Sequence, residues 1–127
     1  MERNSTAADG SATKLEAWMQ SCQEFRRTEQ LLEGATQSAA GLSLNELYLL
    51  HHLLAEPEHK FRVQDAARLI QLSQSATSRL VMRLASLAEP AVERRMCEID
   101  KRGVYIHLTE AGRKLHAQAA QSVEALL

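Results

Sequence analysis

Side chains able to read or hold a DNA duplex are concentrated between residues 73 and 102 of the 127-residue chain. Arg and Gln offer bidentate hydrogen bonds to guanine and adenine, Ser and Thr hydroxyls suit any base, and Lys and Arg also neutralise phosphates. Gln74 and Arg79 are the favoured base readers, whereas Arg83, Arg94 and Arg95 suit phosphates better. The candidate DNA-contacting residues are Ser73, Gln74, Ser75, Thr77, Ser78, Arg79, Arg83, Arg94, Arg95, Lys101 and Arg102.

The distribution of charge supports the same chemistry more than the total charge does. Residues 60–114 carry eleven Lys and Arg against six Asp and Glu, a net charge of +5. The rest of the chain has four basic and ten acidic residues, so the whole chain sums to −1. This asymmetry is typical of a basic working face on an acidic scaffold, although a solvated surface of mixed charge is equally compatible with it.

The sequence contains no arrangement typical of an enzyme or a metal centre. We find no nucleophile elbow, no Gly-rich phosphate loop and no paired-carboxylate pattern. His51 and His52 are adjacent, so on a helix they lie about 100° apart and cannot face one metal ion together. We therefore expect no catalysis, no metal and no cofactor.

The cysteines and the hydropathy pattern indicate the compartment. Cys22 and Cys97 lie 75 positions apart and form no C-x-x-C pair, which excludes a disulfide framework and a zinc ribbon. Cys22 falls among apolar residues, so an inert buried thiol is the simpler interpretation and a redox sensor is the alternative. Because there is no 18-residue apolar run and the first residues are polar, we expect a cytoplasmic protein without membrane contact.

The N-terminal third predicts one long helix between two irregular segments. Residues 1–11 are polar and are expected to form a disordered tail. From about residue 13 to residue 33, apolar residues recur at helical spacing in a narrow stripe, as expected of a helix that meets another helix. Residues 34–41 are small and polar and are expected to form a linker. The stripe consists of Leu15, Trp18, Cys22, Phe25 and Leu32.

The centre of the chain predicts a helix-turn-helix. Ser43 and Glu46 form a capping box that opens a strongly apolar helix. A short helix follows over residues 63–71, and Ser73 caps a longer one that ends near Leu87. In this last helix, one face is expected to turn inward and the other to face DNA through its first turns. The expected inward residues are Ala76, Leu80, Leu84 and Leu87.

A β-hairpin is expected to follow. Residues 92–97 and 104–108 predict two strands, because apolar and polar residues alternate in the second of them. Lys101 and Arg102 fall at the tip, where an arginine can enter a narrow minor groove, and Asp100 can orient one of them. Thr109 then caps a final helix. The expected fold class is mostly α with a small β-hairpin wing, a winged helix-turn-helix over residues 42–109 within a single domain.

Several of these segments together resemble the MarR family of transcriptional regulators. The most specific element is the Asp-x-Arg of the wing followed by Leu-Thr-x-x-Gly-Arg. The resemblance implies a dimer that binds double-stranded pseudo-palindromic operators, with Arg102 in the minor groove and with residues 12–34 and 110–127 as dimerisation helices. The segments that carry it are Arg62–Ala67, Leu72–Ser75, Ser78–Leu84, Glu93–Arg95, Asp100–Gly103 and Leu108–Arg113.

The resemblance also implies a response to a small ligand, because many members release DNA when a phenolic or lipophilic compound binds. The candidate cleft for a small aromatic effector consists of Trp18, Tyr48, His51 and His52. The predicted function is therefore that of a ligand-responsive, sequence-specific repressor acting as a homodimer.

The chain departs from the family pattern in two informative places. The Gly usual between recognition helix and wing is absent from residues 87–92, and the chain ends at Leu127, where members continue with a further C-terminal helix. The second departure motivates an alternative function. In that alternative, a truncated member acts as a protein-interaction module that heterodimerises with a full-length regulator and modulates it.

Overall fold

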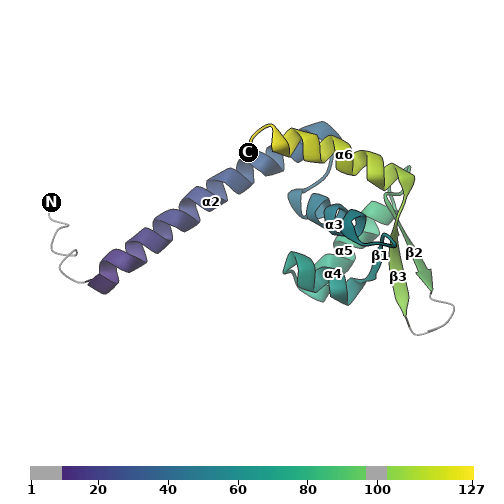
Figure 1. Cartoon of the computed structure of the whole chain (residues 1–127), viewed down its shortest axis with the longest axis horizontal. Helices are drawn as coiled ribbons and strands as arrows, with labels where there is room; N and C mark the ends of the chain where they lie inside the picture. The colour runs from purple at the N-terminus through teal and green to yellow at the C-terminus, as the bar shows by residue number, and fades with distance from the viewer. Residues whose placement is uncertain (1–9, 97–102) are drawn as a thin grey trace.

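The computed structural model describes residues 10–96 and 103–127, and they form a mostly helical protein with a small antiparallel sheet (Figure 1). Part of the expected tail and the wing residues Cys97, Asp100, Lys101 and Arg102 lie outside this described part. The elements are α2 (Gly10–Ala40), α3 (Leu44–Ala55), β1 (Lys60–Arg62), α4 (Val63–Ile70), α5 (Gln74–Ala85), β2 (Val92–Met96), β3 (Val104–Leu108) and α6 (Glu110–Glu124).

Helix α2 is longer than expected, and the predicted linker over residues 34–41 is wrong. The helix begins at Gly10 and continues through this small-residue segment to Ala40. Leu32 and Thr36 are buried there, because α6 lies along this end of α2 (Figure 1). Packing thus keeps a segment of weak hydrophobic pattern helical. The helix ends at Ala40, and the positive φ of 67° at the following Gly41 lets Leu42 N–H reach back to the Thr36 carbonyl at 3.4 Å.

Helix α3 forms the centre of the core, and its predicted capping box is confirmed. Glu46 N–H donates to Ser43 Oγ at 3.1 Å, and Ser43 N–H donates to Glu46 Oε1 at 2.8 Å. Leucines on several sides of the helix are buried, because α2, α4, α5 and α6 all contact it. These leucines are Leu44, Leu47, Leu49, Leu50 and Leu53.

The helix-turn-helix is formed by α4 and α5. The turn between them is tight because Gln71 adopts the left-handed conformation, with φ 60°, and Leu72 N–H donates to the Ala67 carbonyl at 3.1 Å. Ser73 caps α5, as expected, by accepting from Ala76 N–H at 3.1 Å. The short helix, tight turn and capped second helix confirm the pattern inferred from the sequence.

The sheet has the order β1-β3-β2 and contains one strand more than expected. Its β2–β3 hairpin matches the prediction, with Val92 opposite Leu108 and Met96 opposite Val104. Strand β1 is only three residues long, too short to show an alternating pattern, and sequence reasoning missed it. It places Phe61 opposite Ile106, and both side chains are buried against the helices.

Helix α6 fixes the base of the wing. Thr109 caps the helix by accepting from Gly112 N–H at 2.9 Å, and its own hydroxyl donates to the Pro90 carbonyl at 2.6 Å. A Cβ at Gly112 would lie 2.1 Å from the Ala91 carbonyl oxygen, so only glycine permits this approach. The wing therefore has a defined entry even though the usual Gly is absent from residues 87–92.

Candidate nucleic-acid interface

The outward face of α5 presents polar side chains beside the base of the wing. Gln74, Ser75 and Arg79 are exposed, and Ser78 is half-buried. Gln74 and Ser78 border a hollow of about 220 Å³ that is also lined by residues 62–64, where β1 joins α4, and by residues 103 and 104 at the start of β3. Of the two favoured base readers, Gln74 therefore lies on a concave surface between helix and wing, and Arg79 is exposed farther along the same helix.

Thr77 does not belong to this surface, and its assignment as a DNA contact is wrong. The side chain is completely buried, and Thr77 Oγ1 donates to the Ser73 carbonyl at 2.8 Å. The buried residues of α5 are Thr77, Val81 and Leu84, whereas Ala76 and Leu80, expected inward, are only partly buried. Because adjacent positions differ by about 100°, this rotation turns Thr77 into the core.

Arg83 is also directed at its own chain. Arg83 Nη1 lies 2.5 Å from Glu46 Oε1, and Nη2 donates to the Gly41 carbonyl at 2.9 Å. The Glu46 carboxylate is buried and simultaneously completes the α3 capping box. The Arg83 guanidinium, expected to contact a phosphate, is thus already bound to two acceptors of its own chain.

The basic residues of β2 are exposed at the edge of the wing. Arg94 points to solvent, and Arg95 donates to Glu93 Oε1 from Nη2 at 2.7 Å. Across the sheet, Tyr105 lies under two cations, with Lys60 Nζ at 5.1 Å and the Arg62 guanidinium at 5.3 Å from the ring centre. Sequence reasoning missed this cluster because it depends on β1, which brings residues 60–62 beside residue 105.

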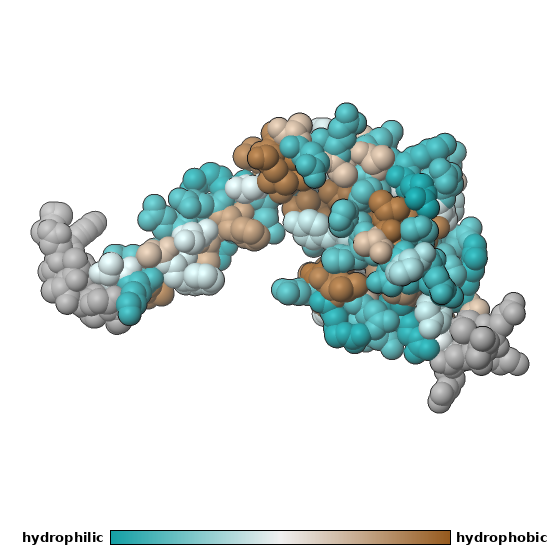
Figure 2. All heavy atoms as spheres, in the orientation of Figure 1, coloured by the Kyte–Doolittle hydropathy of each residue, from teal (hydrophilic) through white to brown (hydrophobic). Residues whose placement is uncertain are grey.

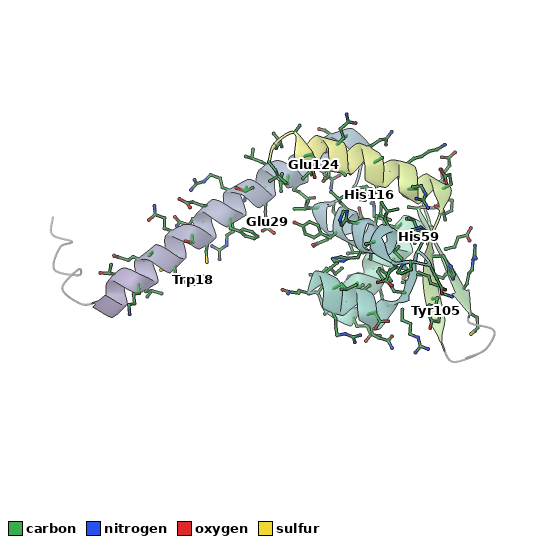
Figure 3. All side chains as sticks on the ribbon, in the orientation of Figure 1. Trp18, Glu29, His59, Tyr105, His116 and Glu124 are labelled. Atoms are coloured by element: carbon green, nitrogen blue, oxygen red, sulfur yellow. The ribbon has the colours of Figure 1, made fainter. Side chains whose placement is uncertain are left out.

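The candidate effector cleft is not gathered within one chain. Trp18 is 66% exposed on the part of α2 that projects from the body, far from His116 beside α3 (Figure 3). Tyr48 instead lies near Glu29 of α2. Glu29 is 11 residues beyond Trp18, which corresponds to about 16 Å along the helix axis. Burial and then the carboxylates of Glu29 and Glu33 raise the pKa of Tyr48, so its α2 side is an acidic environment.

The two histidines of the cleft have separate environments. His51 Nδ1 lies 2.9 Å from His116 Nε2 of α6, with the two rings stacked, whereas His52 is half-buried. Burial, followed by His51, lowers the pKa of His116 below 6.5, which favours the neutral form of the His116 ring. Neither ring is placed to share an effector with Trp18.

In the part of the chain that the structure describes, neither Cys22 nor a cluster of metal-ligating side chains adds to the site. Cys22 is a half-buried free thiol on α2. Within residues 10–96 and 103–127, no group of three or more His, Cys, Asp or Glu side chains could hold a metal ion. In the same part of the chain, no helix is both long and apolar enough to cross a membrane.

Two packed helices with a tight turn, followed by a hairpin that flanks the second helix, define a winged helix-turn-helix protein. No protein-family model and no curated protein matches the sequence. Solved structures do match: Sco3205, a MarR family transcriptional regulator from Streptomyces coelicolor in complex with DNA, superposes with a TM-score of 0.82. It is 25% identical, over 90% of this chain and 73% of that chain.

Two further solved structures have the same fold. AbsC, a MarR family transcriptional regulator from the same organism, has a TM-score of 0.79 and 27% identity over 89% of this chain and 74% of that chain. The transcriptional regulator BldR from Sulfolobus solfataricus shares the fold at 21% identity, with a TM-score of 0.77 over 90% of this chain and 78% of that chain. The chain therefore has the winged-helix fold seen in MarR family transcriptional regulators.

Proposed function

We propose that this protein is a sequence-specific DNA-binding regulator of transcription that acts as a homodimeric repressor. The observation that carries the proposal is the polar face of α5 beside the wing, where Gln74 and Ser78 line a concave surface and Arg79 is exposed farther along the same helix. The regulator Sco3205, to which this chain is similar, was solved in complex with DNA. Bidentate Gln and Arg contacts on the first turns of a recognition helix supply base selectivity.

Within this proposal the remaining basic residues hold the duplex. Arg94 and Arg95 are exposed along β2 and would contact phosphates, and Ser73 and Ser75 lie at the N-terminus of α5, where backbone N–H groups favour an anion. Lys101 and Arg102 are proposed to reach the minor groove, with Asp100 orienting the arginine. Neutralising several phosphates makes affinity fall steeply with salt.

The dimer is supported by the apolar residues that α2 leaves uncovered. Leu15, Trp18, Met19 and Phe25 are each more than half exposed on the projecting part of the helix, and brown patches follow this helix in Figure 2. A row of exposed large apolar side chains on one helix is typical of a protein interface. A symmetric dimer would place its two α5 helices in successive major grooves, about 10 base pairs apart.

Release of DNA by a small aromatic effector is the finer part of the proposal. Because Tyr48, His51 and His52 lie far from Trp18 in the same chain, a cleft that includes all four would need Trp18 of the partner subunit. Such an effector would act at the border between the dimerisation helices and the DNA-binding region. The proposed location is the cytoplasm, and the proposed function requires neither a cofactor nor a membrane.

DNA binding measured by fluorescence anisotropy at two salt concentrations tests the proposal. Wild type, Arg79→Ala, Arg102→Ala and the control Arg113→Ala, which removes the same charge from α6, are compared on the upstream region of the gene and on a shuffled duplex. We expect Arg79→Ala to lose about 10- to 100-fold of the preference for the upstream duplex, because a bidentate base contact contributes about 1–3 kcal/mol. Arg102→Ala should weaken binding, and Arg113→Ala should retain the preference.

Weak and equal binding of the wild type to both duplexes would contradict the proposal. The exposed stripe of α2 then favours the alternative, in which the chain pairs with a full-length regulator and modulates it. That outcome is recognised by a heterodimer that forms in preference to the homodimer.

A further inference from the structure

A hydrogen-bonded cluster joins the recognition helix to the end of α2. From α5, Arg83 donates to two acceptors that lie 37 and 42 positions earlier in the chain, Glu46 Oε1 and the Gly41 carbonyl. Glu33 of α2 adds a third link, because its Oε1 accepts from Leu44 N–H at 2.9 Å. We call Glu33, Gly41, Ser43, Glu46 and Arg83 the junction cluster.

The chemistry of the junction cluster makes Arg83 hard to replace. The Glu46 side chain is only 3% exposed, and a buried carboxylate without a partner is strongly destabilising. Its Oε1 is satisfied by the Ser43 N–H and by Arg83. The second acceptor, Gly41, directly follows the C-terminus of α2, where carbonyl groups attract a cation. A planar guanidinium reaches both acceptors at once, whereas an ammonium group acts as a single point charge.

We propose that Arg83 is a positioning residue that sets the orientation of α5 relative to the α2–α3 junction, and that it does not contact phosphate. The proposal rests on the proposed function, since it concerns how the DNA-reading helix is held. Through Glu46 and Gly41 the guanidinium ties the last turn of α5 to the N-terminus of α3 and the end of α2. The first turns of α5, with Gln74 and Ser78, remain open to the duplex.

The arrangement also makes α2 and α5 mechanically coupled. α2 carries the exposed apolar stripe at one end and the Glu33–Leu44 contact near the other. A displacement of α2 on assembly or ligand binding moves Gly41 and the cap of α3, and therefore the two acceptors of Arg83. The orientation of α5 then changes at a distance from the site of the displacement, without any contact between α2 and DNA.

The decisive variant is Glu46→Gln, because a buried residue cannot touch DNA and the loss of a negative charge cannot weaken attraction to phosphates. We would compare Arg83→Gln, Arg83→Lys, Glu46→Gln, the double variant Arg83→Gln/Glu46→Gln and the phosphate control Arg94→Gln. The measurements are the preference for the upstream over the shuffled duplex and the slope of log affinity against log salt. Circular dichroism confirms that each variant is folded, and Arg83→Lys, which keeps a charge beside Glu46, remains usable if Arg83→Gln unfolds.

We expect Arg83→Gln and Glu46→Gln each to lower the preference at least about tenfold with an unchanged salt slope, and the double variant to be no worse than the more damaged single variant. Arg83→Lys should fall between these and the wild type, because it loses the Gly41 contact only. Arg94→Gln should reduce the slope by about 0.9 and keep the preference. A slope reduced by Arg83→Gln, together with wild-type preference in Glu46→Gln, would overturn the proposal.

Amide hydrogen exchange in the DNA-free protein separates this proposal from the proposed function. Arg83→Gln should speed the exchange of the Ser43 N–H, whose acceptor is Glu46 Oε1, and of the backbone amides in the last turn of α5. Arg94→Gln should change neither. If the wild type does not discriminate between duplexes, the proposed function fails. The exchange experiment then tests by itself whether Arg83 couples α5 to the α2–α3 junction. Unchanged exchange in a folded Arg83→Gln variant would refute it.

Discussion

Helices α2 and α3 both carry many large apolar side chains, but those of α3 are buried and many of those of α2 are exposed. The leucines of α3 at positions 44, 47, 49, 50 and 53 are all at most 6% exposed, because helices and sheet surround that helix. On α2, residues 15, 18, 19 and 25 are all at least 53% exposed, since α6 reaches only the other end of the helix (Figure 1). The core of the body is closed within one chain, whereas the stripe of α2 is left uncovered by that chain.

The largest effect is expected for the buried core around α3. Leu50→Ala should lower the free energy of unfolding by about 2–5 kcal/mol, because Leu50 is fully buried and its truncation leaves a cavity. Leu69→Ala, at a position 44% exposed, should cost less than about 1 kcal/mol. Urea denaturation measures both, and similar losses for the two variants would remove the distinction between closed core and surface.

The next largest effect is expected for the exposed apolar stripe of α2. Phe25→Glu should dissociate the proposed dimer at least about tenfold more readily, because it places a charge within the exposed apolar stripe proposed as the interface. Gln20→Glu adds the same charge to an exposed polar position on the opposite side of α2 from the stripe, and should leave assembly unchanged. Sedimentation at several protein concentrations measures the mass. A wild type that stays monomeric, or a Phe25→Glu variant that dimerises normally, would contradict the assignment of the stripe as an interface.

Two helical glycines sharpen the comparison further. Gly112→Ala should cost about 1–3 kcal/mol, because the added Cβ would lie 2.1 Å from the Ala91 carbonyl oxygen and force α6 away from the wing. Gly34→Ala on α2 meets nothing within 4 Å and should be neutral or stabilising by up to about 1 kcal/mol. Thermal denaturation distinguishes them, and equal effects would show that α6 does not need its close approach to Ala91.

The smallest effect is a pH dependence of the α3–α6 contact. Burial and His51 lower the folded-state pKa of His116 below its ordinary value of 6.5, so the unfolded chain binds more protons between these two pKa values. The stabilisation is therefore fully present above pH 6.5 and is lost as the pH falls toward the folded-state pKa. Wild type should lose more of its free energy of unfolding than His116→Gln between about pH 7.5 and about pH 5.5.

His107 supplies the background in that experiment. Its pKa is also lowered, by burial first and then by Arg95 and Lys60, against an opposing effect of Glu93, so both proteins retain this contribution. A control variant, His52→Gln, should behave as the wild type. Identical pH profiles for wild type and His116→Gln would show that the His51–His116 pair does not contribute.

Features that depend on neighbouring residues were predictable from the sequence. The caps at Ser43, Ser73 and Thr109 all form as expected, because each joins a side chain to an amide three residues away. The β2–β3 hairpin follows from alternation and a nearby glycine. The exposure of the proposed DNA-contacting residues Gln74, Ser75 and Arg79 could be inferred as well, since they are polar residues of a capped helix.

Features that depend on distant partners were not predictable in this way. The three residues of β1 are a strand only because β3 pairs with them, and the helical conformation of residues 34–40 depends on α6. Thr77 and Ala76 have similar local patterns, and packing against α3 and α4 decides which one is buried. The two acceptors of Arg83 lie 37 and 42 positions away in the sequence, so no local pattern indicated them. From its place on α5 alone, Arg83 was therefore interpreted as a phosphate contact.

The sequence by itself therefore determined the order of the helices, the capped helix-turn-helix, the hairpin and the chemical character of the α5 face, because these arise from local hydrogen bonds and from the period of apolar residues. The tertiary structure alone decided which face of α5 is buried, that Arg83 binds the α2–α3 junction, and that the apolar stripe of α2 stays uncovered. Each of these depends on contacts between residues far apart in the chain, whose geometry is set only when the whole core packs.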